Sequence, residues 1–389
     1  MMTSASHSPA GVASPKTGRE GGSMSSPWCG ALPNESGPEK ARTRSWLSSL
    51  GIDRGGIVRI QTFAARNSVA MLHFEDGTAL FLKQVDPATA RAVGTATGNE
   101  EKMLRLIPES DVPHHVRTAV PRFIATDPET ETLVMEGKTG FVSMRDVGRK
   151  FPEIPVPLLV SLASVTAGLH TSTVERFTTD PGYRPQLIDF PFASFVTLTP
   201  SELASGPGMD YSDYAATMQA VDDSVARMRE EWTPRRLVHF DLRDDNILVK
   251  DAEGARPQVA LVDWELSGFG DPMLDVGTII GQFLIQWLHT VRGDAGRLAD
   301  ASTWATVRRN VGLFLTAYEH SAPLSLEQRD LAFRYAGLSV LMYAAGRLEQ
   351  IGSLGQIGHL CLFVGRTLLN DPRGVAELLA PGILRKAGA

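Results

Sequence analysis

LVHFDLRDDNILV, from Leu237 to Val249, is the stretch around which the rest of the chain is organised. His239, Asp241 and Asn246 stand in it between apolar segments. Apolar runs of this length are typical of buried strands, so the polar residues are expected on a short loop between them.

A second stretch, VALVDW at residues 259–264, is an apolar run that ends in Asp263, which is expected to emerge at the end of a strand. Phosphoryl transfer needs one carboxylate to accept a hydroxyl proton, and a second carboxylate with an amide oxygen to hold magnesium. Asp241, Asp263 and Asn246 supply this set, at the H-x-D-x-x-x-x-N spacing of kinase catalytic loops. The two stretches together predict a phosphotransfer site.

The composition is that of a globular chain long enough for two lobes: 389 residues, 43% hydrophobic and 21% charged. A formal net charge of -6 argues against a nucleic-acid partner. The most apolar segment, 274–288, contains Gln282 and Gln286 and is shorter than a membrane span, so it is expected to be a core helix and no membrane partner is expected. Cys29 and Cys361 are expected to be free thiols in a reducing cytoplasm.

The first 42 residues are rich in Ser, Gly and Pro, and we expect residues 1–42 to form a disordered tail. They lack the charged-then-apolar pattern of a signal peptide, which also favours a cytoplasmic location. The run Arg19–Gly22 before Met24 raises the hypothesis of a later translation start, which leaves open whether residues 1–23 are made. A short helix is expected over residues 41–50.

Residues 43–137 form the predicted β-rich, nucleotide-binding lobe. Asp76-Gly77 is a hairpin signal between two β-type runs, and a third run precedes them. TLVME at 132–136 predicts a further buried strand. The three antiparallel runs are IVRIQTF at 57–63, VAMLHF at 69–74 and TALFLKQV at 78–85.

Lys83 stands among apolar residues near the end of the third run, where a lysine needs a partner or a ligand. A lysine at the strand edge that extends to solvent is the plainer interpretation. Glu100, at the start of a helical segment whose apolar face includes Met103 and Ile107, offers a partner instead. A strand lysine paired with a helix glutamate is the arrangement that holds nucleotide phosphates in kinases.

Residues 138–389 are predicted to be mainly helical and to carry the catalytic loop and the acceptor site. Apolar residues recur there at three- and four-residue spacing, which is typical of helices that face a core. Residues 178–209 are rich in Pro, Gly and Thr and are expected to be an irregular insertion. The apolar stripes run through residues 158–169, 214–232, 304–318 and 331–345.

The chain resembles the aminoglycoside phosphotransferase and choline kinase family, whose members have a protein-kinase-like fold, over roughly residues 45–350. HFDLRDDN is similar to the family's Brenner-type loop, and VDWELSGFGDPMLDVG to its metal-binding strand followed by Gly-Asp-Pro-x-x-Asp. The resemblance implies an α+β, two-lobed fold with a small antiparallel β-rich N-lobe and a larger, mainly helical C-lobe.

The resemblance also implies roles for individual residues. Asp241 would be the catalytic base, while Asn246 and Asp263 would bind magnesium. Lys83 would hold nucleotide phosphates and Glu100 would orient it. His239, grouped with the catalytic residues, is expected to structure the loop through hydrogen bonds. Asp275 would support the lobe, or else serve only as a carboxylate at a helix N-terminus. Glu136 would end the strand that leads into the adenine-binding hinge.

Two departures from the family pattern stand out. The expected phosphate-binding turn, Ala64–Ser68, has no glycine, so the backbone amides of Asn67 and Ser68 would have to approach the phosphates, with Arg66 adding charge. Tight nucleotide binding is therefore an open question. Phe240 stands where the family often has glycine, and its bulk is expected to shape the acceptor pocket.

The resulting functional prediction is an ATP-dependent, magnesium-assisted phosphotransferase acting on a hydroxyl of a small molecule. Two alternatives remain open: a kinase-like enzyme that modifies Ser or Thr of a natural-product precursor peptide, clasped by the insertion 178–209, and a pseudokinase that serves as a scaffold. GTP in place of ATP, the acceptor and the oligomeric state are also left open. Arginines scattered through the C-terminal helices argue against a polycationic aminoglycoside. These are Arg308, Arg309, Arg329, Arg334 and Arg347.

Overall fold

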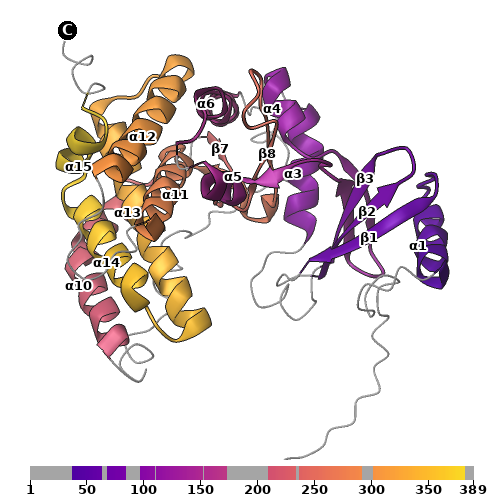
Figure 1. Ribbon diagram of the computed structural model, residues 1–389, viewed down its shortest axis with the longest axis horizontal. Coiled ribbons are helices and arrows are strands. Elements are labelled where there is room, and N and C mark those ends of the chain that lie inside the picture. Colours follow the sequence, from indigo (N-terminus) through magenta and orange to yellow (C-terminus); the bar gives the residue numbers. More distant parts are fainter. Residues whose placement is uncertain are drawn as a thin grey trace, which may run out of the picture.

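The structure is a computed structural model of two lobes, a sheet-rich N-lobe and a helical C-lobe (Figure 1). The predicted fold class is confirmed. The expected insertion 178–209 lies outside the described residues except for Met209, and so do residues 1–36. The structure describes residues 37–63, 68–84, 97–109, 111–151, 153–172, 209–233, 236–290 and 301–381.

The N-lobe sheet has five antiparallel strands in the order β1-β2-β3-β5-β4. The expected hairpin turn joins β2 to β3, with Gly77 at a φ of 77° that glycine adopts without strain. Strand β4 was not anticipated from the sequence, since its FIATD run is short and not strongly apolar. The strands are β1 Ile57–Phe63, β2 Ser68–Phe74, β3 Ala79–Gln84, β4 Phe123–Asp127 and β5 Thr132–Glu136.

Successive side chains of β3 alternate between the two faces of this sheet. Leu80 and Leu82 pack in the cluster that Leu47 of α1 (Gly37–Ser49) completes on the outer face. The opposite face of β3 carries Lys83 toward α3 (Thr97–Glu109), which Figure 1 shows between the sheet and the helical lobe. Helix α1 begins at Gly37, four residues before the helix expected over residues 41–50.

Short antiparallel strands of the C-lobe carry the two motif stretches, residues 237–249 and 259–264. Strand β8 pairs with β9 in a register that sets Ile247 opposite Leu261. Asn246 precedes Ile247 and Val262 follows Leu261, so this register makes Asn246 and Val262 neighbours as well. The remaining short elements are β6 Val142–Ser143, β7 Arg236–Val238, β8 Ile247–Lys250, β9 Gln258–Leu261, the 3₁₀ turn η1 Trp264–Leu266 and β10 Gly268–Gly270.

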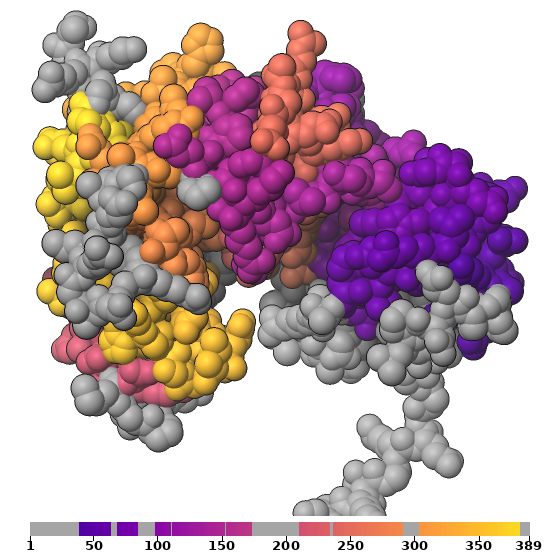
Figure 2. Space-filling view, in the orientation of Figure 1, coloured from indigo at the N-terminus to yellow at the C-terminus, as the bar shows by residue number. Residues whose placement is uncertain are grey.

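Long helices form the body of the C-lobe, and the expected apolar stripes fall on α6, α10, α12 and α13. Helix α11 packs so closely on α13 that a Cβ at Gly277 would lie 2.5 Å from the carbonyl oxygen of Ala332. None of the described helices is both long and apolar enough to cross a membrane. The helices are α4 His114–Ala119, α5 Met144–Lys150, α6 Val156–Thr171, α10 Met209–Glu230, α11 Met273–Thr290, α12 Ala301–Ser321, α13 Leu326–Ile351, α14 Gly355–Asn370 and α15 Pro372–Leu379. Figure 2 shows a wide opening between the N-lobe and the ends of α13 and α14.

Candidate active site

The loop that carries Asp241 is suspended from a buried carboxylate in the first turn of α11. The two oxygens of Asp275 accept the backbone N–H groups of His239 at 2.7 Å and Phe240 at 2.9 Å. Asp275 is fully buried, and His170 of α6 lies 3.1 Å from it while also bonding to Tyr318. Asp275 is expected to support the lobe or to serve as a carboxylate at a helix N-terminus; it stands in the first turn of α11, and its contacts also tie the loop to the C-lobe.

His239 joins the two motif stretches. Its Nε2 lies 3.0 Å from the carbonyl oxygen of Val262, and the Val262 N–H donates to the carbonyl of Asn246 at 3.0 Å. Burial lowers the pKa of His239, despite three nearby carboxylates that favour its charged form. A neutral histidine that donates to a backbone carbonyl and packs against Trp264, with the ring centroids 4.5 Å apart, has the contacts of a structural residue.

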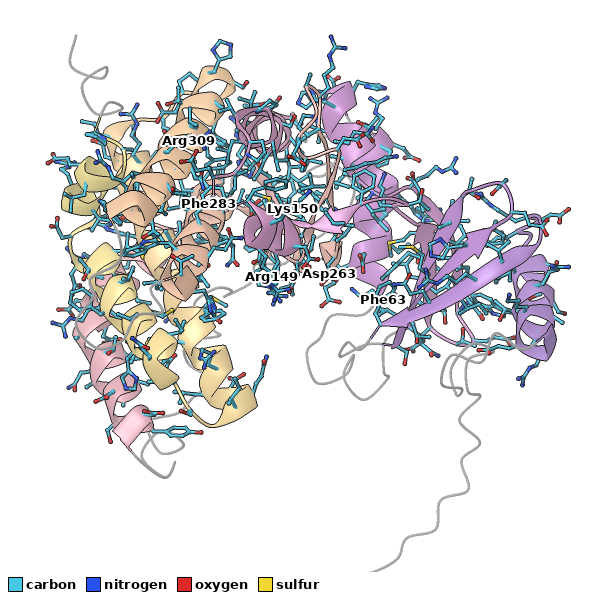
Figure 3. The ribbon with its side chains drawn as sticks, in the orientation of Figure 1. Phe63, Arg149, Lys150, Asp263, Phe283 and Arg309 are labelled. Atoms are coloured by element: carbon cyan, nitrogen blue, oxygen red, sulfur yellow. The ribbon has the colours of Figure 1, made fainter. Side chains whose placement is uncertain are left out.

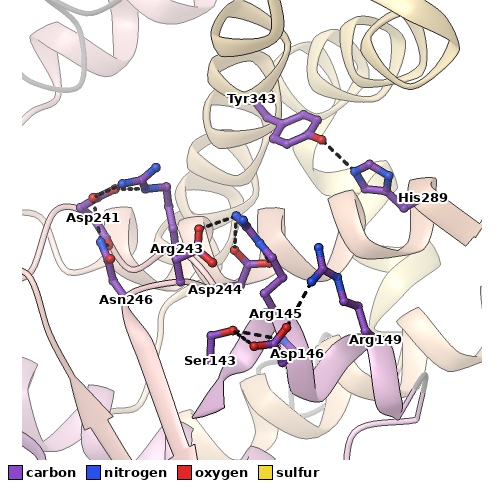
Figure 4. Close-up of polar contacts among 11 residues, drawn as sticks. Ser143, Arg145, Asp146, Arg149, Asp241, Arg243, Asp244, Asn246, His289 and Tyr343 are labelled. Atoms are coloured by element: carbon purple, nitrogen blue, oxygen red, sulfur yellow. Dashed lines mark hydrogen bonds and ion pairs between the residues drawn. The ribbon is translucent and has the colours of Figure 1, made fainter. Parts of the chain in front are cut away.

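Asp241 points its carboxylate at two neighbours on the same loop (Figure 4). Arg243 donates to it through Nε at 2.7 Å and Nη2 at 2.8 Å. Asn246 donates through Nδ2 to both the carboxylate, at 2.8 Å, and the backbone oxygen of Asp241, at 2.9 Å. The amide oxygen of Asn246 is a donor atom of the type that magnesium prefers.

Lys83 lies in a buried cluster of carboxylates between the lobes. Its Nζ donates to Glu100 at 2.8 Å, to Glu265 at 2.8 Å, and to Asp263. Burial by itself would lower the pKa of Lys83, but the charges of the three carboxylates outweigh it and raise the pKa above its ordinary value. The structure thus brings the predicted pair Lys83 and Glu100 together with Asp263, which Figure 3 shows in the space between the lobes.

Glu265 is the residue of this cluster that sequence reasoning did not select. Glu100, Asp263 and Glu265 each offer a carboxylate oxygen within 4.8 Å of the others, a grouping suited to a hard cation. Asp263 stands at a φ of 69°, a left-handed turn that lets the next residues double back as η1. The sequence signal that could have indicated Glu265 is its position as an acidic residue two residues after Asp263. Asn99 of α3 holds the segment through the carbonyl oxygens of Glu265 and Ser267.

The residues expected to contact the nucleotide are less completely described. Asn67 lies outside the described residues, and Ser68 is exposed at the start of β2. The Glu136 N–H donates to the carbonyl of Arg122 at 2.9 Å, and its carboxylate lies 3.2 Å from Nζ of Lys138. Both groups of Glu136 are therefore already engaged within the protein.

Phe240, whose bulk is expected to shape the acceptor pocket, is buried in the core of the C-lobe. Its side chain is buried, with its ring centroid 6.0 Å from that of Trp232. A Cβ at Gly270 would lie 2.8 Å from Cζ of Phe240, so the ring packs directly beside this glycine. The Phe240 φ of 68° lies in the left-handed region, and this explains why glycine suits the position.

Comparison with known families identifies the chain. A model of the phosphotransferase enzyme family matches residues 59–309, well over half of the chain, and includes parts of both lobes and the whole cluster described above. The chain belongs to the phosphotransferase enzyme family. No curated protein matches it.

Solved structures share the fold of this phosphotransferase at low sequence identity. Amicoumacin kinase hAmiN, solved with AMP-PNP, Ca²⁺ and Ami, is 16% identical, with a TM-score of 0.54; the match covers 88% of this chain and 96% of that one. A choline/ethanolamine kinase family protein from Mesorhizobium loti is 16% identical, with a TM-score of 0.51, and covers 87% and 99% of the two chains. The predicted family resemblance and the prediction of a phosphotransferase are confirmed.

The scattered arginines of the phosphotransferase do not support the argument about acceptor charge. Four of the five are bound to groups of the protein itself, so their presence says little about the acceptor surface. Arg309 donates to the Ile154 carbonyl, Arg329 to Glu319, Arg334 to Glu231 and Arg347 to the Leu354 carbonyl.

Proposed function

We propose that this phosphotransferase moves the γ-phosphoryl group of ATP to a hydroxyl of a small molecule, with Asp241 as the base. The observation that carries the proposal is the double link through Val262, which ties the Asp241 loop to the segment of Asp263, the carboxylate that Lys83 contacts from the N-lobe sheet. A proton acceptor tied to a candidate metal-binding carboxylate, with a phosphate-binding lysine beside that carboxylate, supplies the parts that in-line transfer requires.

In the proposed reaction the acceptor oxygen forms a bond to the γ-phosphorus as the bond to the bridging oxygen breaks. The hydroxyl proton passes to the carboxylate of Asp241, and the electron pair of the broken bond leaves with ADP. Lys83 neutralises phosphate charge, and Glu100 keeps it directed at the site.

Asn246, Asp263 and Glu265 are the residues that fit a magnesium ion. Their free donor atoms are an amide oxygen and carboxylate oxygens, the hard ligands that this ion takes in phosphoryl-transfer sites. Bound magnesium would supply charge neutralisation for the phosphates. Lys83 now contacts both carboxylates of this set, so it would share them with the ion.

The test has two parts. First, the melting temperature is measured with and without millimolar ATP and magnesium; we expect a rise of several degrees, because a ligand of the native state stabilises it. Second, Asp241→Asn should retain that rise in melting temperature. Its turnover with an acceptor should fall by at least about 1,000-fold, and where no acceptor is at hand the same fall is expected in the hydrolysis of ATP by water. Turnover within tenfold of wild type in this variant would refute the role of Asp241.

The same measurements bear on the alternatives. A scaffold without nucleotide would show no shift with ATP, GTP or magnesium, whereas GTP specificity would show as a larger shift with GTP. A peptide acceptor would rest on the insertion 178–209, and no contact among the described residues favours it.

A further inference from the structure

A cavity lies between α12 and the end of α15, two helices that Figure 1 shows on the side of the C-lobe away from the N-lobe. Its volume is about 750 Å³, which is within the range of sites that bind small molecules. Residues of α12 from Ala305 to His320 line the cavity, so it is elongated along this helix. Leu313 of α12 and Leu379 of α15 give it apolar walls.

The cavity is separate from the candidate active site. Tyr318 of α12 bonds to His170, which in turn lies beside Asp275. The residues of α12 that line the cavity, among them Gly312 and Thr316, stand on a different face of this helix from Tyr318. A molecule in the cavity would therefore bind apart from the nucleotide and the acceptor.

Arg308 is a cation of this cavity for which the described part of the chain offers no hydrogen bond or ion pair. Its side chain is partly buried, and its Nε is fully buried without a partner. The acidic residue of the lining, Glu319, is already engaged, because both of its carboxylate oxygens accept from Arg329. A guanidinium withdrawn from water without a counter-charge raises the free energy of the protein, and a bound anion would offset this.

Gly312 leaves the wall of the cavity open in the middle of α12. A glycine inside a helix is destabilising relative to alanine, and close packing or a function usually explains its presence. Packing explains Gly277 of α11, but a Cβ at Gly312 would meet nothing within 4 Å. The missing side chain instead leaves space one turn after Arg308, on the same side of the helix.

We propose that this cavity binds a small molecule in which one anionic head group, such as a carboxylate, is joined to an apolar chain. The head group would pair with Arg308, because the planar donors of a guanidinium match the two oxygens of a carboxylate. The chain would lie over Gly312 and against Leu313 and Leu379. The unpaired charge selects the head group, and the apolar walls select the chain.

The test measures binding of octanoate to the full-length protein by calorimetry. Acetate, the head group almost alone, should bind at least about 100-fold more weakly, because it lacks the methylene groups that the walls would cover. The neutral chain, 1-octanol, should bind at least about tenfold more weakly than octanoate, because it lacks the charge that pairs with Arg308.

Variants at Arg308 test the head group. Arg308→Leu should bind octanoate at least about tenfold more weakly. It should melt no lower than wild type, because no hydrogen bond or ion pair of the described chain is lost. Arg366→Leu, at an exposed arginine of α14, is the matched control and should bind octanoate as wild type does.

Variants at Gly312 test the place of the chain. Gly312→Leu fills the open space and should abolish binding of octanoate. Gly312→Ala adds a single methyl group, so it should keep most of the affinity and raise the melting temperature, since alanine favours the helix.

Several results would overturn the proposal. Wild-type protein that binds no octanoate at millimolar concentration would do so, and so would equal affinity for octanoate in wild type and Arg308→Leu. Acetate or 1-octanol bound as tightly as octanoate would show that the cavity does not require both parts of the molecule. Unchanged affinity in Gly312→Leu would place octanoate elsewhere on the protein.

Discussion

Asp275 holds the backbone N–H of Phe240 at 2.9 Å, in a left-handed conformation that phenylalanine rarely adopts. The buried carboxylate thus stabilises the strained residue that directly precedes the candidate base. The strain energy of this conformation of Phe240 is offset by interactions of the C-lobe, which are the Asp275 hydrogen bond from the α11 turn and the packing of the core around the Phe240 ring.

Asp275→Asn should reduce both stability and turnover. An amide has one acceptor oxygen and no charge, so one of the two backbone N–H groups loses its partner in a buried site. We expect unfolding in urea to require about 3 kcal/mol less, and kcat to fall roughly 100-fold because the base is displaced. Asp222→Asn, on the exposed side of α10, should change neither quantity. Wild-type stability in Asp275→Asn would contradict the role assigned to its two hydrogen bonds.

Phe240 offers a comparison in which glycine should be better than alanine. Both Phe240→Ala and Phe240→Gly lose the buried ring, at about 3–5 kcal/mol. Only alanine keeps a Cβ at a φ of 68°, so Phe240→Gly should be the more stable of the two by roughly 0.5–1 kcal/mol. Chemical denaturation of the two variants decides this, and the usual order, alanine above glycine, would show that the left-handed conformation is not retained.

Lys83→Met should convert a carboxylate cluster that holds one ammonium into a site that needs another cation. Removing the buried ammonium leaves Glu100 without its charge partner, which should cost about 3 kcal/mol in unfolding free energy without metal. Magnesium, added without nucleotide, should then raise the melting temperature of Lys83→Met more than that of wild type, since it can replace the lost charge.

The control for this experiment is the double variant Lys83→Met/Glu100→Gln. It should recover part of the lost stability, because the buried charge is gone together with its partner. Equal responses to magnesium in wild type and Lys83→Met would count against the carboxylate cluster as a cation site.

His359 should make stability depend on pH where α10 meets the start of α14. Its Nδ1 bonds to the Gly355 carbonyl at 2.8 Å, and its Nε2 lies 3.1 Å from Asp213 and 3.4 Å from Asp210. The carbonyl, followed by the carboxylates, raises the pKa of His359 above its ordinary value. The stabilisation is therefore complete below the unfolded-state pKa, about 6.5, and is lost as pH rises through the higher folded-state pKa.

Melting curves across pH measure this effect. The difference between wild type and His359→Gln should be largest near about pH 5–6 and should disappear in alkaline buffer. His114→Gln, an exposed histidine of α4, serves as the control and should show no such trend. A difference that grew with pH would reverse the sign and rule out the charged form of His359 as the cause.

The sequence predicted the parts of the fold that depend on local pattern. The hairpin at Asp76-Gly77, the strand at 132–136 and the helical stripes follow from turn chemistry and periodicity, which act within a few residues. Strand β4 has neither signal, and its pairing with β5 comes from tertiary packing.

The residues of the candidate site likewise fall into those that local sequence pattern could indicate and those that it could not. Lys83 and Glu100 could be paired from the sequence because an apolar context makes a charge conspicuous. Glu265 and Arg243 stand in polar surroundings, where acidic and basic residues are common, so their partners could be recognised only from the three-dimensional arrangement. Arg243 in particular is separated from Asp241 by one residue, and it is the turn of the loop that aims it back.

The close contact between Gly277 and Ala332 has a consequence for how the two lobes work together. Gly277 lets α11 pack closely on α13, because a Cβ there would clash with the Ala332 carbonyl, and Asp275 stands two residues before Gly277 in the same helix. Lys83 is mounted on the sheet of the other lobe. Asp241, the proposed base, is thus tied through Asp275 to the helical lobe, so a movement of the N-lobe against the C-lobe would change the distance between Lys83 and Asp241.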